Sequence, residues 1–298
     1  MPNIELATQY APYVDEIFAR ESKIDLLTNQ DFNFNGAHSV KIYKVSTSAM
    51  NDYDRNGAQN SYSRFGTATD LDATTEECTL KKDRSFTFVV DKLDNDETAG
   101  QLSGASALAR QTRQVVVPEI DTYIYDVMTK GAGTKPAAVT LTVDNIYDEI
   151  TKGTELLDDA EVPETERVLT VTPAVYRLMK KSKEITMETE IGEDMRLKGV
   201  ISNLDGMTVV KVPASRLPKN FGFMISHKSA TVAPKKLEEY RTHQDPPGIS
   251  GELVEGRICY DAFVLDNKAK AIYYQAVNVN TVDNVDETEP TEETTGKK

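Results

Sequence analysis

The chain has 298 residues, of which 39% are hydrophobic, and a formal net charge of −14. This apolar content supports a sizeable core and excludes a chain that is disordered throughout. No apolar run approaches the roughly 18 residues that a membrane span needs, and the N-terminal residues show no secretory signal pattern. The only two cysteines, Cys78 and Cys259, are far apart in the sequence and are expected to be reduced thiols.

The negative charge is concentrated in two segments. Residues 141–166 hold nine carboxylates against the single Lys152, and residues 278–298 hold six against two lysines. A nucleic-acid-binding groove needs clustered lysine and arginine, and this charge distribution argues against one. The distribution suits a protein that lies near nucleic acid without binding it.

The first part of the chain predicts an arm followed by two strands. Residues 10–27 carry apolar side chains at helical spacing, which indicates a short amphipathic helix on an extended arm; a weakly packed terminus would show the same pattern. Residues 39–45 alternate apolar side chains with lysines and predict a strand. Residues 84–91 predict a second strand, which is expected to be its partner.

A long polar ribbon, residues 46–79, separates these two strands and contains a turn signal at Asn56-Gly57. Ordering such a segment costs roughly 1–2 kcal/mol per residue, so it is either disordered or stabilised by contacts outside the subunit. Spaced apolar residues distinguish it from a flexible linker and favour the second alternative. These residues are Met50, Tyr53, Tyr62, Phe65 and Leu71.

The middle of the chain is predicted to alternate helices and strands. A helical period from Glu97 to about residue 130 predicts a long helix with a kink at Pro118 and an end at Gly131. Thr142 is the expected N-cap of an acidic helix that Pro163 closes. Further on, the patterns predict a strand at 167–172, a helix at 173–183, a loop at 184–198 and strands at 207–212 and 221–226.

The last third is predicted to be mostly strand. Strands are expected at 236–241, 253–265 and 271–277, with a rigid turn at Asp245-Pro246-Pro247-Gly248. The acidic tail after residue 278 cannot bury apolar surface and is expected to be disordered.

No motif in the sequence indicates catalysis. His38, His227 and His243 have no cysteine or histidine at metal-ligand spacing, and neither a GxSxG motif nor a Walker loop occurs. The carboxylates between residues 70 and 77 lack the spacing of a calcium loop. The sequence therefore predicts no enzymatic activity, no cofactor and no bound metal.

Five segments carry a recognisable pattern: YAPYVDEIF (10–18), FTFVVDK (86–92), ARQTRQVVVPEIDTY (109–123), VPASRLP (212–218) and LEEYRTHQDPPGISGELVEGR (237–257). They resemble one branch of the major capsid proteins of tailed bacteriophages, within a similarity that extends from about residue 4 to 277. The resemblance implies the α+β fold of those proteins, which encapsulins share. It implies an N-terminal arm (1–37), an extended hairpin loop over the adjacent subunit (38–92), a peripheral domain with a long spine helix (93–131 and 232–262), an axial domain (132–231 and 263–277) and a disordered tail (278–298).

The resemblance also implies a structural protein that assembles as hexamers and pentamers into an icosahedral shell around double-stranded DNA. It would be made in the host cytoplasm and reside in the virion. The implied partners are other copies of the chain, a scaffolding protein, a portal and, as an optional partner, a decoration protein, with packaged DNA nearby and no membrane. The residues expected at contacts between subunits are Met50, Tyr53, Arg55, Tyr62, Arg64, Phe65, Asp245, Pro246, Pro247 and Gly248.

Some relatives join subunits covalently through a lysine of the extended loop and an asparagine of a neighbour. Here no lysine lies between Ser46 and Leu80, and residues 243–250 contain no asparagine, so no such cross-link is expected.

Other interpretations are weaker. An encapsulin-like nanocompartment shell, which would enclose a cargo enzyme, is the nearest alternative, and the similar segments favour the phage protein over it. A hydrolase with a long substrate loop is disfavoured by the missing nucleophile and metal motifs. A β-rich adhesin is disfavoured by the long helix and the missing secretion signal.

Overall fold

The computed structural model describes residues 21–29, 39–55, 63–66, 68, 70–71, 73–97, 103–187 and 203–278. The chain mixes helix and sheet, in agreement with the predicted α+β class, and divides into two compact units. The first unit comprises residues 1–131 and 228–269, and the second comprises residues 132–227 and 270–298. The predicted Asn56-Gly57 turn, Tyr62 and the acidic tail lie outside the described residues.

The observed division differs from the expected domain boundaries near residues 231 and 263. Strand β11 (Phe263–Val264) pairs with β8 (Thr231–Val232), and the Leu265 N–H donates to the Ala230 carbonyl at 3.0 Å. These hydrogen bonds join the two segments to each other. Both segments belong to the first unit, whereas the expected boundaries place residues 228–231 and 263–269 in the axial domain.

The strand β1 (Ser39–Val45) forms as predicted, but its partner is β2 (Ala73–Thr79). The prediction that residues 84–91 would pair with it is wrong. The two strands are antiparallel, with Ser39 opposite Thr79 and Val45 opposite Ala73. Three threonines in β2 favour the extended conformation, so the end of the polar ribbon can fold back on β1.

A three-stranded antiparallel sheet has the order β3-β10-β9, where β3 is Lys82–Asp91, β10 is Gly251–Tyr260 and β9 is Lys235–Gln244. Val254, Ile258 and Tyr260 on the central strand are buried, while Glu255 and Arg257 between them are exposed. The strand predicted at 253–265 is two strands, because the chain leaves the sheet after Tyr260 and resumes pairing only at β11.

The long helix begins later than predicted. Residues 92–97 form a separate short helix, α1 (Lys92–Glu97), and the long segment starts at α2 (Gly104–Gln111), where the Ser103 hydroxyl accepts a hydrogen bond from the Ser106 N–H at 3.4 Å. Gly104 lies against Val254 and Glu252, so α2 packs on the buried face of β10. The segment continues through a π-helical turn (Thr112–Val116) into α3 (Val117–Gly131), and it ends at Gly131 as predicted.

The π-helical turn lies directly before Pro118. Proline has no N–H to donate, and its ring collides with the carbonyl four residues earlier in a regular helix. Here the Val117 N–H donates to the Thr112 carbonyl, five residues back, which is the π pattern. The wider turn therefore accommodates Pro118 within a continuous helical path, and a kink at this position stays a prediction.

Of the amphipathic helix predicted over residues 10–27, residues 10–20 lie outside the described chain. In the remainder, only Ile24–Leu26 form a short 3-10 helix. Ile24 and Leu27 are buried.

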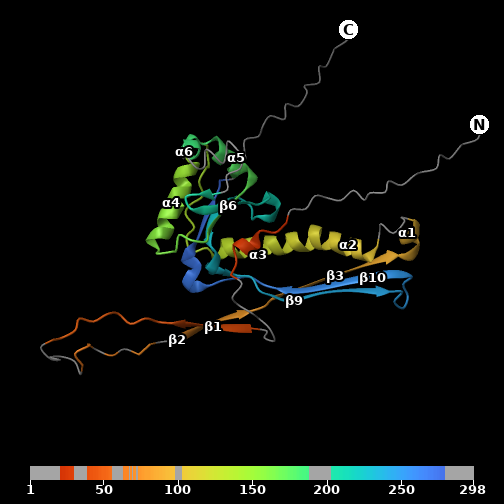
Figure 1. Cartoon of the computed structure of the whole chain (residues 1–298), viewed down its shortest axis with the longest axis horizontal. Helices are drawn as coiled ribbons and strands as arrows, with labels where there is room; N and C mark the ends of the chain where they lie inside the picture. The colour runs from red at the N-terminus through yellow and green to blue at the C-terminus, as the bar shows by residue number, and fades with distance from the viewer. Residues whose placement is uncertain are drawn as a thin grey trace, which may run out of the picture. The chain divides into compact units, whose positions relative to one another are not determined.

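The second unit contains β6, α4, α5 and α6, which are labelled in Figure 1. It is built on a five-stranded sheet with the order β12-β7-β4-β6-β5. The strands are β12 (Ile272–Ala276), β7 (Phe221–His227), β4 (Arg167–Val171), β6 (Met207–Lys211) and β5 (Asn203–Leu204). Strands β4 and β6 are parallel and the other pairs are antiparallel. Every residue of β4 and β7 is buried, which explains their near-continuous apolar sequences.

Three helices accompany this sheet in the described part of the unit: α4 (Ile146–Asp159), α5 (Pro173–Lys181) and α6 (Lys183–Met187). Helix α5 begins at Pro173 as predicted, capped by Thr172. The prediction of a loop at 184–198 is wrong at its start, because α6 occupies residues 183–187 and buries Ile185. The rest of that predicted loop, residues 188–198, lies outside the described residues.

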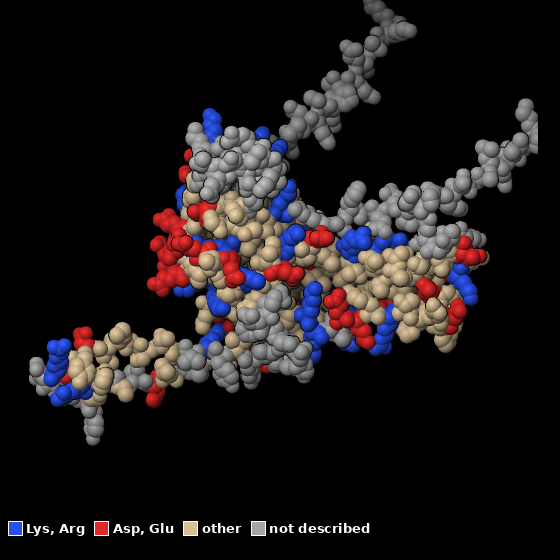
Figure 2. Space-filling model, viewed as in Figure 1, with Lys and Arg blue, Asp and Glu red and all other residues tan. Residues whose placement is uncertain are grey.

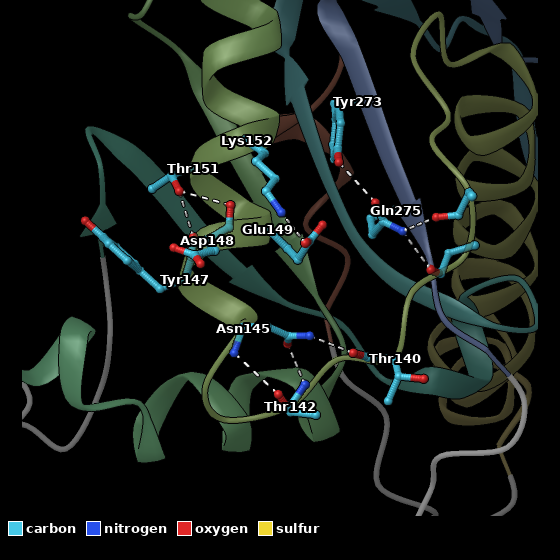
Figure 3. A network of polar contacts seen from close by, with 12 residues as sticks. Thr140, Thr142, Asn145, Tyr147, Asp148, Glu149, Thr151, Lys152, Tyr273 and Gln275 are labelled. Atoms are coloured by element: carbon cyan, nitrogen blue, oxygen red, sulfur yellow. Dashed lines mark hydrogen bonds and ion pairs between the residues drawn. The ribbon is translucent and has the colours of Figure 1, made fainter.

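Helix α4 begins after Asn145 rather than after Thr142. Figure 3 shows the reason: the Asn145 Oδ1 accepts from the Thr142 N–H at 2.7 Å, and the Asn145 Nδ2 donates to the Thr140 carbonyl at 2.8 Å. These bonds fix residues 143–145 as a turn before the helix. Gly153 then lies against Ile225 and Tyr273, so α4 packs on one face of the sheet.

Candidate assembly surfaces

The extended hairpin, residues 39–79, is the first candidate surface. Beyond Val45 the ribbon continues past the paired strands (Figure 1), and its two sides approach each other where the Asp54 N–H donates to the Arg64 carbonyl at 3.0 Å. The Asn51 side chain also donates to the Phe65 carbonyl at 3.4 Å. The described part of the ribbon is therefore held by a few local hydrogen bonds rather than by strand pairing.

This ribbon exposes large apolar side chains. Met50 is 99% exposed, Phe65 is 76% exposed and Tyr53 is 51% exposed, and the rings of Tyr53 and Phe65 meet edge to face with centroids 5.1 Å apart. Arg55 and Arg64 are exposed beside them, and Tyr62 is outside the described residues. Exposed apolar side chains gathered in this way are typical of a surface that another molecule covers.

An ion cluster fixes the base of the hairpin. The Lys44 Nζ lies 3.0 Å from the Glu76 Oε2 on the paired strand, and it also forms an ion pair and hydrogen bond with Asp266. The hydrogen bonds to Asp266 and Glu76 raise the pKa of Lys44. Because Asp266 follows β11 in the sequence, this cluster ties the hairpin to the C-terminal part of the first unit.

Asp261 is a second anchor, and its side chain is buried. Its Oδ1 accepts from the Tyr123 hydroxyl at 2.7 Å and from the Ala262 N–H at 2.8 Å, and its Oδ2 accepts from the Lys81 N–H at 2.8 Å. One carboxylate thus joins the end of the hairpin, the long helix and the end of β10. Burial, and then the bond to Asp261, raise the pKa of Tyr123, so this hydroxyl stays protonated as a donor.

Replacing Asp261 with alanine is expected to lower the free energy of unfolding of the first unit by about 2–4 kcal/mol, because two backbone N–H groups lose their acceptor. Urea unfolding of the unassembled protein, followed by circular dichroism, measures this change. Asp126→Ala is the matched control, since it removes only an exposed pair with Lys130 (2.7 Å), worth about 0.5 kcal/mol. Equal effects of the two substitutions would contradict the assigned role of Asp261.

The turn at residues 245–248 is the second candidate surface. The Asp245 N–H donates to the Gly251 carbonyl at 2.8 Å, and the Asp245 Oδ1 accepts from the Gly251 N–H at 3.0 Å. Gly248 has φ of +85°, a value that glycine adopts easily. Asp245, Pro247 and Gly248 are exposed, so the turn presents a rigid tip at the end of the β9–β10 pair.

Acidic side chains gather over α4 and the turn after it, which is the red patch in Figure 2. The exposed carboxylates of this segment are Asp144, Asp148, Glu155, Asp158, Asp159, Glu161, Glu164 and Glu166. Arg167 is buried beside them, 2.7 Å from Asp158, and donates to the Pro163 carbonyl at 2.8 Å. The surface repels polyanions and is unsuited to binding a nucleic-acid backbone.

Within the described residues, no group of three histidine, cysteine or acidic side chains is placed to hold a metal ion. Glu76 belongs to the group of carboxylates between residues 70 and 77 that could have bound a cation, and it forms an ion pair with Lys44. In the same part of the chain, no helix combines the length and apolar character that crossing a bilayer requires.

The fold is that of bacteriophage capsid proteins. The chain matches a structure from Mycobacterium phage Che8 with a TM-score of 0.75 and 19% identity, over 92% of this chain and 97% of that one. It matches the capsid structure of the cyanophage P-SCSP1u with a TM-score of 0.73 and 14% identity, over 93% of this chain and 94% of that one. It matches the mature capsid of bacteriophage PhiM1 with a TM-score of 0.72 and 14% identity (93% of each chain). No protein-family model and no curated protein matches the sequence.

Proposed function

We propose that this chain is the major capsid protein of a tailed phage, and that it assembles as hexamers and pentamers into an icosahedral shell around double-stranded DNA. The observation that carries the proposal is the fold shared with phage capsid structures over more than nine-tenths of both chains. The exposed apolar ribbon supports it, because a segment that buries so little of its own apolar surface gains stability from a neighbour.

In this proposal the first unit supplies the peripheral domain and the second the axial domain, and residues 1–37 form the N-terminal arm. The extended hairpin lies over an adjacent copy. Ring-forming contacts are head to tail, so the hairpin of one copy meets a different surface on the next. The side chains proposed at these contacts are Met50, Tyr53, Arg55, Tyr62, Arg64 and Phe65 of the hairpin, with Asp245, Pro246, Pro247 and Gly248 of the turn.

The proposed partners are a scaffolding protein, the portal and, as an optional partner, a decoration protein, with DNA packaged against a surface that does not bind it specifically. Synthesis takes place in the host cytoplasm. Electron microscopy of the protein, expressed with and without the scaffold gene beside its own, tests the proposal. Closed shells are expected, and material that stays as single compact subunits under both conditions would overturn it. An enzyme cargo encoded beside the gene, in place of portal and terminase, would instead identify a nanocompartment.

Assembled particles are expected to dissociate into single chains in denaturing gel electrophoresis. The ribbon between Ser46 and Leu80 has no lysine to form an isopeptide bond, and residues 243–250 have no asparagine. Gels of intact, boiled particles check this, and ladders of covalent oligomers would contradict it.

A further inference from the structure

A groove of about 530 Å³ runs along α2 in the first unit. Its apolar lining comes from Ala105, Leu108 and Ala109 of α2, from Val117 and from Tyr240 of β9. The positions in α2 recur three and four residues apart and therefore form one face of the helix. Ala105 and Ala109 are exposed, so the described part of the chain leaves this face open.

The N-terminal part of the described chain begins at this groove. Glu21 and Ser22 line it, and the Ser22 hydroxyl donates to the Asp121 Oδ1 at 2.7 Å. Leu27 is fully buried, and the Asn29 N–H donates to the Thr231 carbonyl at 2.8 Å. Residues 21–29 are thus attached to the first unit, and the residues before Glu21 are tethered at the groove.

The preceding residues have the chemistry that this groove would accept. Val14, Ile17 and Phe18 are apolar and spaced for one face of a helix. Asp15 is acidic and would flank this face of the helix, and Arg113 lines the groove. Apolar side chains would meet the apolar floor and opposite charges would meet at the rim.

We propose that residues 10–20 dock in this groove of their own chain through Val14, Ile17 and Phe18. The covalent tether at Glu21 favours the chain's own segment over a second copy, because it gives the segment a high effective concentration beside the groove. Only the residues before this segment then remain free to reach a neighbouring copy. The inference does not depend on the proposed function.

The absence of tryptophan from the chain provides a direct test. Phe18→Trp introduces a single tryptophan, which can be excited selectively over the 13 tyrosines of the chain. Its emission is expected at the short wavelengths of apolar surroundings and is expected to stay unchanged on dilution. Adding Leu108→Asp within the groove is expected to shift the emission to that of a solvent-exposed tryptophan. Adding Val115→Asp is the matched control, because Val115 is 46% exposed and does not line the groove; it is expected to leave the emission unchanged.

Circular dichroism shows whether each variant is folded, and Ala109→Arg, at an exposed position of the groove, replaces Leu108→Asp if that variant unfolds. Solvent-like emission from the Phe18→Trp protein itself would overturn the proposal. So would short-wavelength emission that persists with the groove substitution. Emission that shifts on dilution to the wavelengths of a solvent-exposed tryptophan would assign the groove to a second copy. That result would equally overturn docking within one chain.

Discussion

Replacing Gly251 with alanine is expected to lower the free energy of unfolding of the first unit by about 3 kcal/mol or more. Gly251 has φ of +140°, and a Cβ atom there would lie 2.2 Å from the Val90 carbonyl oxygen and 2.9 Å from the Lys92 nitrogen. Both neighbours are backbone atoms, one in β3 and one in the residue directly after it, and the pairing of β3 with β10 begins at Gly251 opposite Asp91. Relief of the collision therefore requires the two strands to separate.

Gly248→Ala, in the turn that precedes β10, is the matched control. Gly248 has φ of +85°, but no atom lies within 4 Å of the place that a Cβ would take, so only the backbone strain of about 1 kcal/mol is expected. Urea unfolding of both unassembled variants, followed by circular dichroism, gives the two values. If Gly251→Ala lowers the free energy of unfolding no more than Gly248→Ala does, the end of the β3–β10 pair can separate at little energetic cost, which would contradict the prediction.

Phe65→Asp is expected to reduce the yield of particles at least tenfold while the subunit stays folded. Phe65 is 76% exposed, so its loss removes little from the core of the subunit. In the proposed shell, the same ring is covered by a neighbour, where a buried and unpaired carboxylate is strongly unfavourable. Particle yield by sedimentation and subunit folding by circular dichroism measure the two effects separately.

Ala68→Asp serves as the control, since Ala68 is a small, exposed residue of the same ribbon. It adds the same charge while removing only a methyl group in place of an aromatic ring, and it is expected to lower the yield much less. Wild-type yields from Phe65→Asp would exclude this ring from the contact between subunits. If the Phe65→Asp subunit is unfolded, the contact between Phe65 and Tyr53 instead stabilises the hairpin itself.

Elements with strong local signals were predicted nearly to the residue. Strand β1 was predicted from its alternation of apolar and lysine residues, and α5 from Pro173 at its start. The end of α3 at Gly131 also follows from a local signal. Each depends on residues within a few positions of the element, so the sequence contains the required information.

The anchors of the hairpin were missed. Lys44 and Asp266 are 222 residues apart, and nothing in either segment indicates that they meet. Asp261 offered a weak signal, because it is a charged residue within an otherwise apolar run and such a residue is buried only when it is hydrogen-bonded. That signal indicates a buried carboxylate but does not identify Tyr123 or Lys81 as its partners.

By itself, the sequence determined the mixed fold class, most of the strands and the polar ribbon with its spaced apolar residues. Only the tertiary structure decided that β1 pairs with β2 and that β3 pairs with β10. It also decided that α4 begins after Asn145 and that residues 263–269 belong to the first unit. The physical reason is that helix caps and turns depend on neighbouring residues, whereas strand pairing and buried hydrogen bonds depend on which distant segments the whole chain can bring together.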